Sequence, residues 1–393
     1  MLFTGHFWVT LIVKTMGILR ALLSLSVVRD HRPFFEWFFL IKGGVAVIYF
    51  YIISGFYMSF VILRKYNKEE HGARNFLLGR ALRLYPCYWA VLILTIVARA
   101  VTGMPTIYTS ALDLNWFERI IALFSNTFIM GLDVVISGAV LKWHDGAGGL
   151  DLSWSKMLIM QGWTIGVEIT FYIFAIFFIF KGARSRWLAI GLAIYIRVYF
   201  LLINGKFLNF SHDGIGYSNT PWGYHFFGID LIYFMLGYLA YEGYCLLCRW
   251  EKTNKIRKIH IYLGTGAVAC VLLSLWHHYA ALQTILDYND YRIWVTIPFF
   301  VLLIPGLFRL TKDSRLDDYI GLVSYPIYLD HVIATDIGSK VLSPSIPPVW
   351  ATLISVLSVT LLLVVFVEKP IEAYRRRRSA KAETAANLHL DEK

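Results

Sequence analysis

The sequence predicts an all-α fold, a polytopic membrane helix bundle of about ten transmembrane helices. Hydrophobic residues make up 58% of the 393-residue chain, and its mean hydropathy is +0.58. Only 16% of residues are Asp, Glu, Lys or Arg, against roughly 25% in soluble domains. So few charges cannot cover a water-facing surface of this size. Apolar stretches also recur along the chain at the length that crosses a bilayer.

About 20 mostly apolar residues are needed for a helix to cross the hydrocarbon core. Ten stretches are clear candidates, near 9–29, 39–63, 84–101, 158–181, 187–204, 226–247, 259–276, 293–309, 320–337 and 349–367. An eleventh, weaker stretch lies at 119–140.

Basic clusters set the expected orientation, because Lys and Arg accumulate in cytoplasmic loops. These clusters occupy 64–83, 181–186, 249–258 and 375–378. If all four are cytoplasmic, neighbouring clusters are separated by an even number of spans. The stretch 119–140 is then re-entrant, interfacial or packed on the outer face, and both termini are cytoplasmic. The net charge of +11 is thus read as a topology signal, with the lipid bilayer as a partner and no nucleic acid.

Cysteine usage and the N-terminus predict neither a metal site nor a cleaved signal peptide. Cys245 and Cys248 form a C-x-x-C pair, but no second pair completes a zinc site. Lys14 and Arg20 interrupt the first apolar run, and no small-residue cleavage site follows.

Charged residues within the first span are candidates for function, since charge inside a membrane is costly. Arg20 and His31 are eleven residues apart. That spacing places them on nearly the same helix face, about 16 Å apart along the axis. Asp30 precedes the histidine. Alternatively, Arg20 snorkels to the headgroups and His31 is simply interfacial.

Two pairs of residues, in the second span and just before the third, have a structural explanation that competes with a functional one. Arg80 and Arg83 share one helix face at i, i+3, and paired guanidinium forks bind phosphorylated ligands bidentately. They also suit a cytoplasmic topology signal. Ser54 and Gly55 are small residues that permit close helix approach.

Later spans carry an acid and an imidazole. Glu168 lies in the outer part of the stretch 158–181 with no sequence neighbour to neutralise it. It therefore needs a partner from elsewhere, of the type of His31 or Arg20. His331 follows Asp330 well inside a later span, as a structural hydrogen-bonding group or a second catalytic imidazole.

Taken together and in this order, these motifs resemble the acyltransferase-3 family of bacterial membrane enzymes. The resemblance extends from about Leu19 to Arg378 and implies a membrane domain over 1–370, followed by a basic, then polar, cytoplasmic tail over 371–393. The motifs are Arg20-x10-His31, Ile53-Ser54-Gly55-Phe56, Arg80-x-x-Arg83 with Leu84-Tyr85-Pro86, Trp163-Thr164-Ile165-Gly166-Val167-Glu168, Ser324-Tyr325 with Tyr328-Leu329 and His331, and Glu368-Lys369-Pro370.

Three departures from the family pattern leave acceptor specificity open. Ile48 stands where the family often has Asp or Pro, and Asp330 stands where an aromatic usually precedes the late histidine. Thr164 replaces the serine of the Trp-Ser-Leu motif and keeps its hydroxyl.

The resemblance implies an O-acyltransferase of the bacterial inner membrane. It would move an acetyl or other short acyl group from acyl-CoA to a sugar hydroxyl of a cell-surface or exported polysaccharide, or of its lipid-linked precursor. Acetyl-CoA is the implied co-substrate, with no bound cofactor. The expected roles are His31 as base, Glu168 or Asp30 orienting it, Arg20, Arg80 and Arg83 holding the donor, and Ser54, Tyr325 and His331 as oxyanion or structural support.

Two other classes fit part of this pattern. A transporter or exporter would line its pathway with the same polar groups, but no inverted repeat stands out. A polytopic glycosyltransferase would place acidic residues such as Asp30 and Glu36 in an outer loop, but usually has a large outer domain. Within the acyltransferase interpretation, direct transfer and a relay through an acyl-histidine both remain open.

Overall fold

The computed structural model confirms an all-α membrane bundle. It describes residues 16–31, 41–103, 116–133, 157–203, 225–253, 256–282, 293–342 and 345–378. Within those ranges there is no β-strand. The helices are α1 (Gly17–His31), α2 (Gly43–Arg64), η1 (Tyr66–Lys68), α3 (Gly72–Thr102), α5 (Trp116–Phe128), α8 (Gly162–Phe178), α9 (Ala183–Ile203), α10 (Phe227–Thr253), α11 (Lys258–Leu282), α12 (Ile293–Thr311), α13 (Arg315–Val341), α14 (Pro348–Leu363) and a π-helical turn η4 (Val364–Glu368).

Of the described helices, six are long and apolar enough to cross a membrane: α2, α3, α10, α11, α12, and α14 with its continuation to Arg378. The apolar α8 is shorter, at 17 residues. Predicted spans also coincide with α1, α9 and α13. The count of ten spans and the cytoplasmic position of both termini stay predictions.

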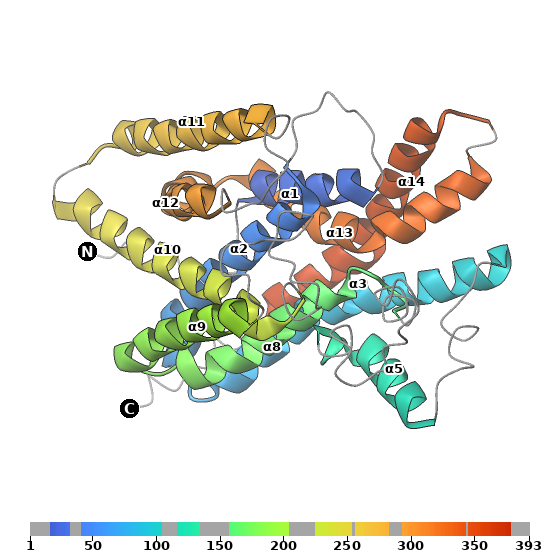
Figure 1. Ribbon diagram of the computed structural model, residues 1–393, viewed down its shortest axis with the longest axis horizontal. Helices are drawn as coiled ribbons and strands as arrows, with labels where there is room; N and C mark the ends of the chain where they lie inside the picture. The colour runs from blue at the N-terminus through green and yellow to red at the C-terminus, as the bar shows by residue number, and fades with distance from the viewer. Residues whose placement is uncertain are drawn as a thin grey trace.

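The helix α2 lies at the centre of the bundle and α11 at its edge (Figure 1). In the most apolar 18-residue window of each helix, 83% of α2 is buried but only 6% of α11. Leu263 and Leu273 of α11 are 64% and 67% exposed. Such an apolar, unburied helix surface is expected to contact lipid.

Glycines allow α2 and α10 to pack backbone against backbone. A Cβ at Gly55 would lie 2.0 Å from the Phe234 carbonyl oxygen, and one at Gly237 would lie 2.1 Å from that of Ile52. No larger residue fits at this separation without moving a helix. The predicted close helix approach at Ser54-Gly55 is therefore confirmed.

Helices α1 and α13 run parallel, in contact at intervals of seven residues. Seven residues make about two helical turns, so each contact returns to the same face. The three contacts are Gly17 N donating to Asp317 Oδ2 (2.7 Å), Ser24 Oγ donating to the Ser324 carbonyl (2.7 Å), and the rings of His31 and His331, with centroids 5.0 Å apart.

The segment 119–140 does not contain a full span within its described part. At 13 residues, α5 is about 20 Å long, too short for the hydrocarbon core. It lies beside α3 (Figure 1): Tyr85, Tyr88 and Trp89 donate hydrogen bonds to the carbonyls of residues 128, 126 and 127. This agrees with a packed or interfacial segment. Residues 134–140 lie outside the described residues.

After α14, the chain passes through the wider turn η4 and stays helical to Arg378. Arg376 forms ion pairs with Glu372 at 3.0 Å and with Asp318 of α13 at 3.5 Å. The basic residues expected to begin the tail at 371 therefore form the end of a helix that contacts α13.

Candidate active site

A cavity of ≈ 120 Å³ lies among α1, α2, α3, α8 and α13. It brings together side chains that are far apart in the sequence. Six of the nine predicted site residues line it: Arg20, Ser54, Arg80, Arg83, Glu168 and Tyr325. Asp30, His31 and His331 do not.

Arg20, Arg80 and Arg83 give the cavity a cationic lining. Arg80 is only 5% exposed, and its guanidinium lies 5.9 Å from the centroid of the Phe76 ring. Its Nε has no hydrogen-bond partner among the described residues. Nor does any described carboxylate lie within 4.0 Å of the three guanidinium groups. One buried and two half-buried cations without a carboxylate at ion-pair distance favour an anionic ligand.

Glu168 is held by two hydroxyl groups. Ser54 Oγ of α2 donates to Glu168 Oε1 at 2.5 Å, and Tyr172 OH of α8 donates to the same oxygen at 2.6 Å. Arg20 lines the same cavity, but its guanidinium lies beyond ion-pair distance of this carboxylate. His31 does not line this cavity, and no hydrogen bond joins it to Glu168 within the described part of the chain.

Tyr328 connects the cavity to the two histidines. Its hydroxyl shares a 2.7 Å hydrogen bond with Thr164 Oγ1, and its side chain lines the cavity. Its backbone carbonyl is 2.8 Å from His331 Nδ1. The next carbonyl, that of Leu329, accepts a hydrogen bond from Gln161 Nε2. One turn of α13 therefore separates the cavity from the histidine pair.

His31 and His331 meet edge to face, with their ring planes at 61°. His31 Nδ1 is 2.9 Å from the Val27 carbonyl. A carbonyl accepts only, so Nδ1 carries the proton, and the neutral ring keeps its lone pair on Nε2. His31 is exposed at the end of α1, whereas His331 is fully buried. His31 therefore has the free access that a base needs.

Neither predicted carboxylate orients His31 in this arrangement. Asp30 Oδ2 instead accepts from Gly43 N at 2.9 Å, so it caps the start of α2, where a helix favours negative charge. The backbone carbonyl of Val27 holds the imidazole. Asp30 and Glu168 were expected to orient His31. In the structure, Asp30 instead caps α2 and Glu168 lines the cavity.

Asp330, which departs from the family pattern, also has a structural contact. It is fully buried and accepts from Thr360 Oγ1 of α14 at 2.8 Å. Tyr325, expected to support an oxyanion, donates its hydroxyl to the Leu84 carbonyl at 2.9 Å.

Tyr172 was not singled out from the sequence, and Tyr328 was named only as part of a motif, without a role. Tyr172 follows Glu168 by four residues, a spacing at which helical side chains meet, so this contact was available from the sequence. The hydrogen bond between the Tyr328 and Thr164 hydroxyl groups joins α13 to α8, and no sequence spacing indicates it.

Comparisons with known proteins agree with this architecture. The family model described as "Acyltransferase domain", of the acyltransferase-3 type, matches residues 1–368. A stretch of 165 residues is 25% identical to an uncharacterized protein of Haemophilus influenzae. That match covers 41% of this chain and 59% of the Haemophilus protein. No solved structure matches.

Proposed function

Because the chain belongs to the acyltransferase-3 family and is a multi-pass membrane acyltransferase, we propose that it moves a short acyl group, acetyl first, from acyl-CoA to a sugar hydroxyl. The proposed acceptor is a cell-surface or exported polysaccharide or its lipid-linked precursor. The proposed location is the bacterial inner membrane.

One observation carries this proposal. Three arginines of α1 and α3 line one cavity without a carboxylate at ion-pair distance, and one exposed imidazole lies further along α1. The arginines suit the phosphates of CoA, which arrive from the cytoplasm. The histidine lies about 16 Å further along α1, at its predicted outer end. The bundle would thus hold the donor near one face and the acceptor near the other.

In the proposed reaction the sugar hydroxyl oxygen attacks the thioester carbonyl carbon, and His31 Nε2 takes the hydroxyl proton. The tetrahedral intermediate collapses with cleavage of the C–S bond. CoA leaves as a thiolate and takes up the proton held by His31. His331, buried against His31, would keep the ring in place and restrict water on that side.

Glu168 would act on the donor side of the path. Its carboxylate, fixed by Ser54 and Tyr172, lines the same cavity as Arg20 and would offset part of that positive charge without an ion pair. Arg80 and Arg83 would bind the donor phosphates. In the acyl-histidine relay, His31 Nε2 attacks the thioester first and CoA leaves as a thiolate. The sugar hydroxyl then attacks the acyl group on the imidazole, the N–C bond breaks to restore neutral His31, and the hydroxyl proton passes to the CoA thiolate.

The test is mass spectrometry of surface and exported glycans from a deletion strain and the same strain complemented with the gene. We expect the polymer to persist and to lose one O-acyl mass, which returns on complementation. Loss of the whole polymer would instead indicate export or glycosyl transfer. Purified protein with [¹⁴C]acetyl-CoA and the de-acylated glycan then tests transfer directly.

A further inference from the structure

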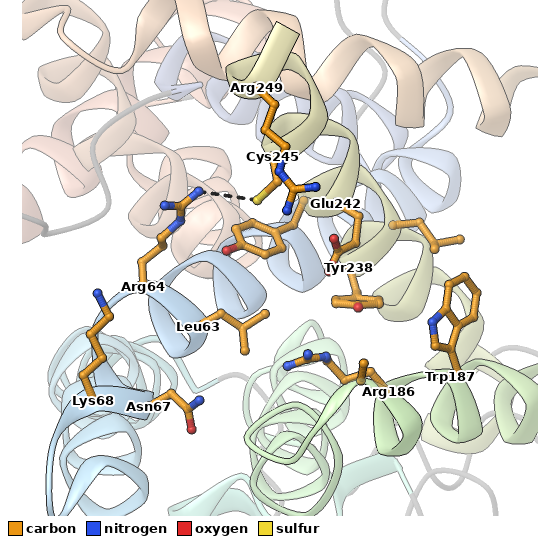
Figure 2. A pocket seen from close by; sticks show the side chains of 13 residues that line it. Leu63, Arg64, Asn67, Lys68, Arg186, Trp187, Tyr238, Glu242, Cys245 and Arg249 are labelled. Carbon is orange, nitrogen blue, oxygen red and sulfur yellow. Dashed lines mark hydrogen bonds between the residues drawn. The ribbon is translucent and has the colours of Figure 1, made fainter. Parts of the chain in front are cut away.

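A second and larger cavity, of ≈ 740 Å³, opens between the C-terminal end of α2, the N-terminal end of α9 and the middle of α10 (Figure 2). It shares no lining residue with the cavity that holds Glu168. The four cations in its lining, Arg64, Lys68, Arg186 and Arg249, belong to the basic clusters 64–83, 181–186 and 249–258, which the charge pattern predicts to be cytoplasmic.

The lining of this second cavity is cationic. Figure 2 shows Arg64, Lys68, Arg186 and Arg249 around one hollow, and they come from different helices or from the turn after α2. Glu242 is the single carboxylate in the lining. None of the four cations forms an ion pair with a carboxylate in the part of the chain that the structure describes.

The guanidinium of Arg186 is fixed in place by two backbone carbonyls and an aromatic ring. Its Nη1 donates to the carbonyls of Ile179 and Lys181 at 3.4 and 3.1 Å, and its Cζ lies 5.8 Å from the Tyr238 ring centroid. Its Nε is shielded from solvent and has no hydrogen-bond partner among the described residues. A donor left without an acceptor beside an open cavity favours a bound acceptor group.

The remaining contacts of the cations are weak. Arg64 Nη2 donates to Cys245 Sγ at 3.5 Å, a poor acceptor, and the guanidinium also interacts with the Tyr241 side chain. Trp187, 60% exposed, flanks the same opening in Figure 2. Guanidinium groups that converge from three helices match the several oxygens of one phosphate better than any single carboxylate.

We infer that this cavity is a second anion site, which binds a phosphate-bearing ligand from the cytoplasmic side between Arg64, Arg186 and Arg249. Two sources share that chemistry: the headgroup of an acidic phospholipid and the phosphates of a soluble nucleotide such as CoA. The inference does not rest on acyl transfer, because binding can be measured without turnover.

The test compares two double variants of the full chain in nanodiscs. Arg64→Gln with Arg249→Gln removes two exposed cations of the cavity. Arg184→Gln with Lys252→Gln removes two exposed cations outside it, at the N-terminal end of α9 and the C-terminal end of α10. Both lose the same charge. One arm measures CoA affinity in phosphatidylcholine discs. The other counts retained phosphatidylglycerol by native mass spectrometry in the absence of CoA.

We expect the cavity variant to bind one probe at least about tenfold more weakly than wild type, the loss expected when charge-assisted hydrogen bonds are removed, and the control to stay within about twofold. Loss of CoA binding identifies a nucleotide site, and loss of phosphatidylglycerol identifies a lipid site. Equal binding by both variants in both arms, or no binding of either probe by wild type, overturns the inference. Melting temperatures of both variants establish that they are folded.

Discussion

The imidazole of His31 lies 5.0 Å from that of His331, centroid to centroid, at the last of three contacts spaced seven residues apart between α1 and α13. The pair is therefore placed by helix register over the whole length of α1. Its two members differ in environment, since His31 is exposed and His331 is fully buried.

Replacing His31 with Ala is expected to reduce acyl transfer by about 10²–10⁴-fold, the usual effect of losing a general base. The side chain is exposed and, among the residues that the structure describes, hydrogen-bonds only to its own helix, so expression and melting temperature should hold. His71→Ala, at the exposed N-cap of α3, is the matched control. A fully active His31→Ala enzyme would remove the histidine from the mechanism.

Ser54→Ala and Tyr172→Phe each remove one hydrogen bond to Glu168 Oε1. A hydrogen bond to a charged group is worth about 1.5–3 kcal/mol, so transfer should fall by about 10–100-fold in each variant. Because both bonds converge on one oxygen, the double variant should lose less than the product of the two losses. Thr170→Val, which removes only a bond within α8, should be silent. Initial rates of acyl transfer by the purified variants are the measurement. If the loss in the double variant equals the product of the two single losses, the two hydroxyl groups do not share a role.

Arg80→Lys keeps the charge of the cavity but loses the planar fork. We expect the KM for acyl-CoA to rise by about tenfold or more, since bidentate phosphate contacts are lost, while kcat changes less. Arg74→Gln alters an exposed arginine of the same helix and should leave KM unchanged. An unaltered KM in Arg80→Lys, with the donor varied at saturating acceptor, would separate Arg80 from donor binding.

Gly237→Ala should destabilise the bundle by about 1–3 kcal/mol, the cost of overpacking a tight contact. The added methyl carbon would lie 2.1 Å from the Ile52 carbonyl oxygen, so α2 and α10 must separate. Gly264→Ala in α11 meets nothing within 4 Å and should be neutral or slightly stabilising. Thermal unfolding in detergent compares the two; equal melting temperatures would show that the helices are free to shift.

Much of the fold was predictable because lipid imposes length and apolarity on each span. The expected stretches 39–63, 226–247 and 293–309 became α2, α10 and α12 nearly unchanged. The stretch 84–101 was too short, since α3 begins at Gly72. Arginines lower the hydropathy of that first part but are good helix formers.

The site was predictable in composition but not in arrangement. Spacing alone suggested that Arg80 and Arg83 act together, and both line one cavity with Arg20. It could not show that Asp30 caps α2, or that Ser54 donates to Glu168, because both contacts depend on helices meeting in space. Spacing also could not show that the histidine pair lies outside the cavity, because the position of that pair depends on the parallel register of α1 and α13.

The wider turn at Val364–Glu368 sets the angular phase of the chain that follows it. A π-helical turn holds one residue more than the α-helix needs, so deleting one residue there would restore a regular α-helix and leave residues 369–378 on nearly the same face. Arg376 would then stay beside Asp318, its partner at 3.5 Å. The same deletion within the regular helix that follows would rotate the later residues by about 100°. The chain should therefore tolerate the loss of one codon within this turn better than a loss just after it.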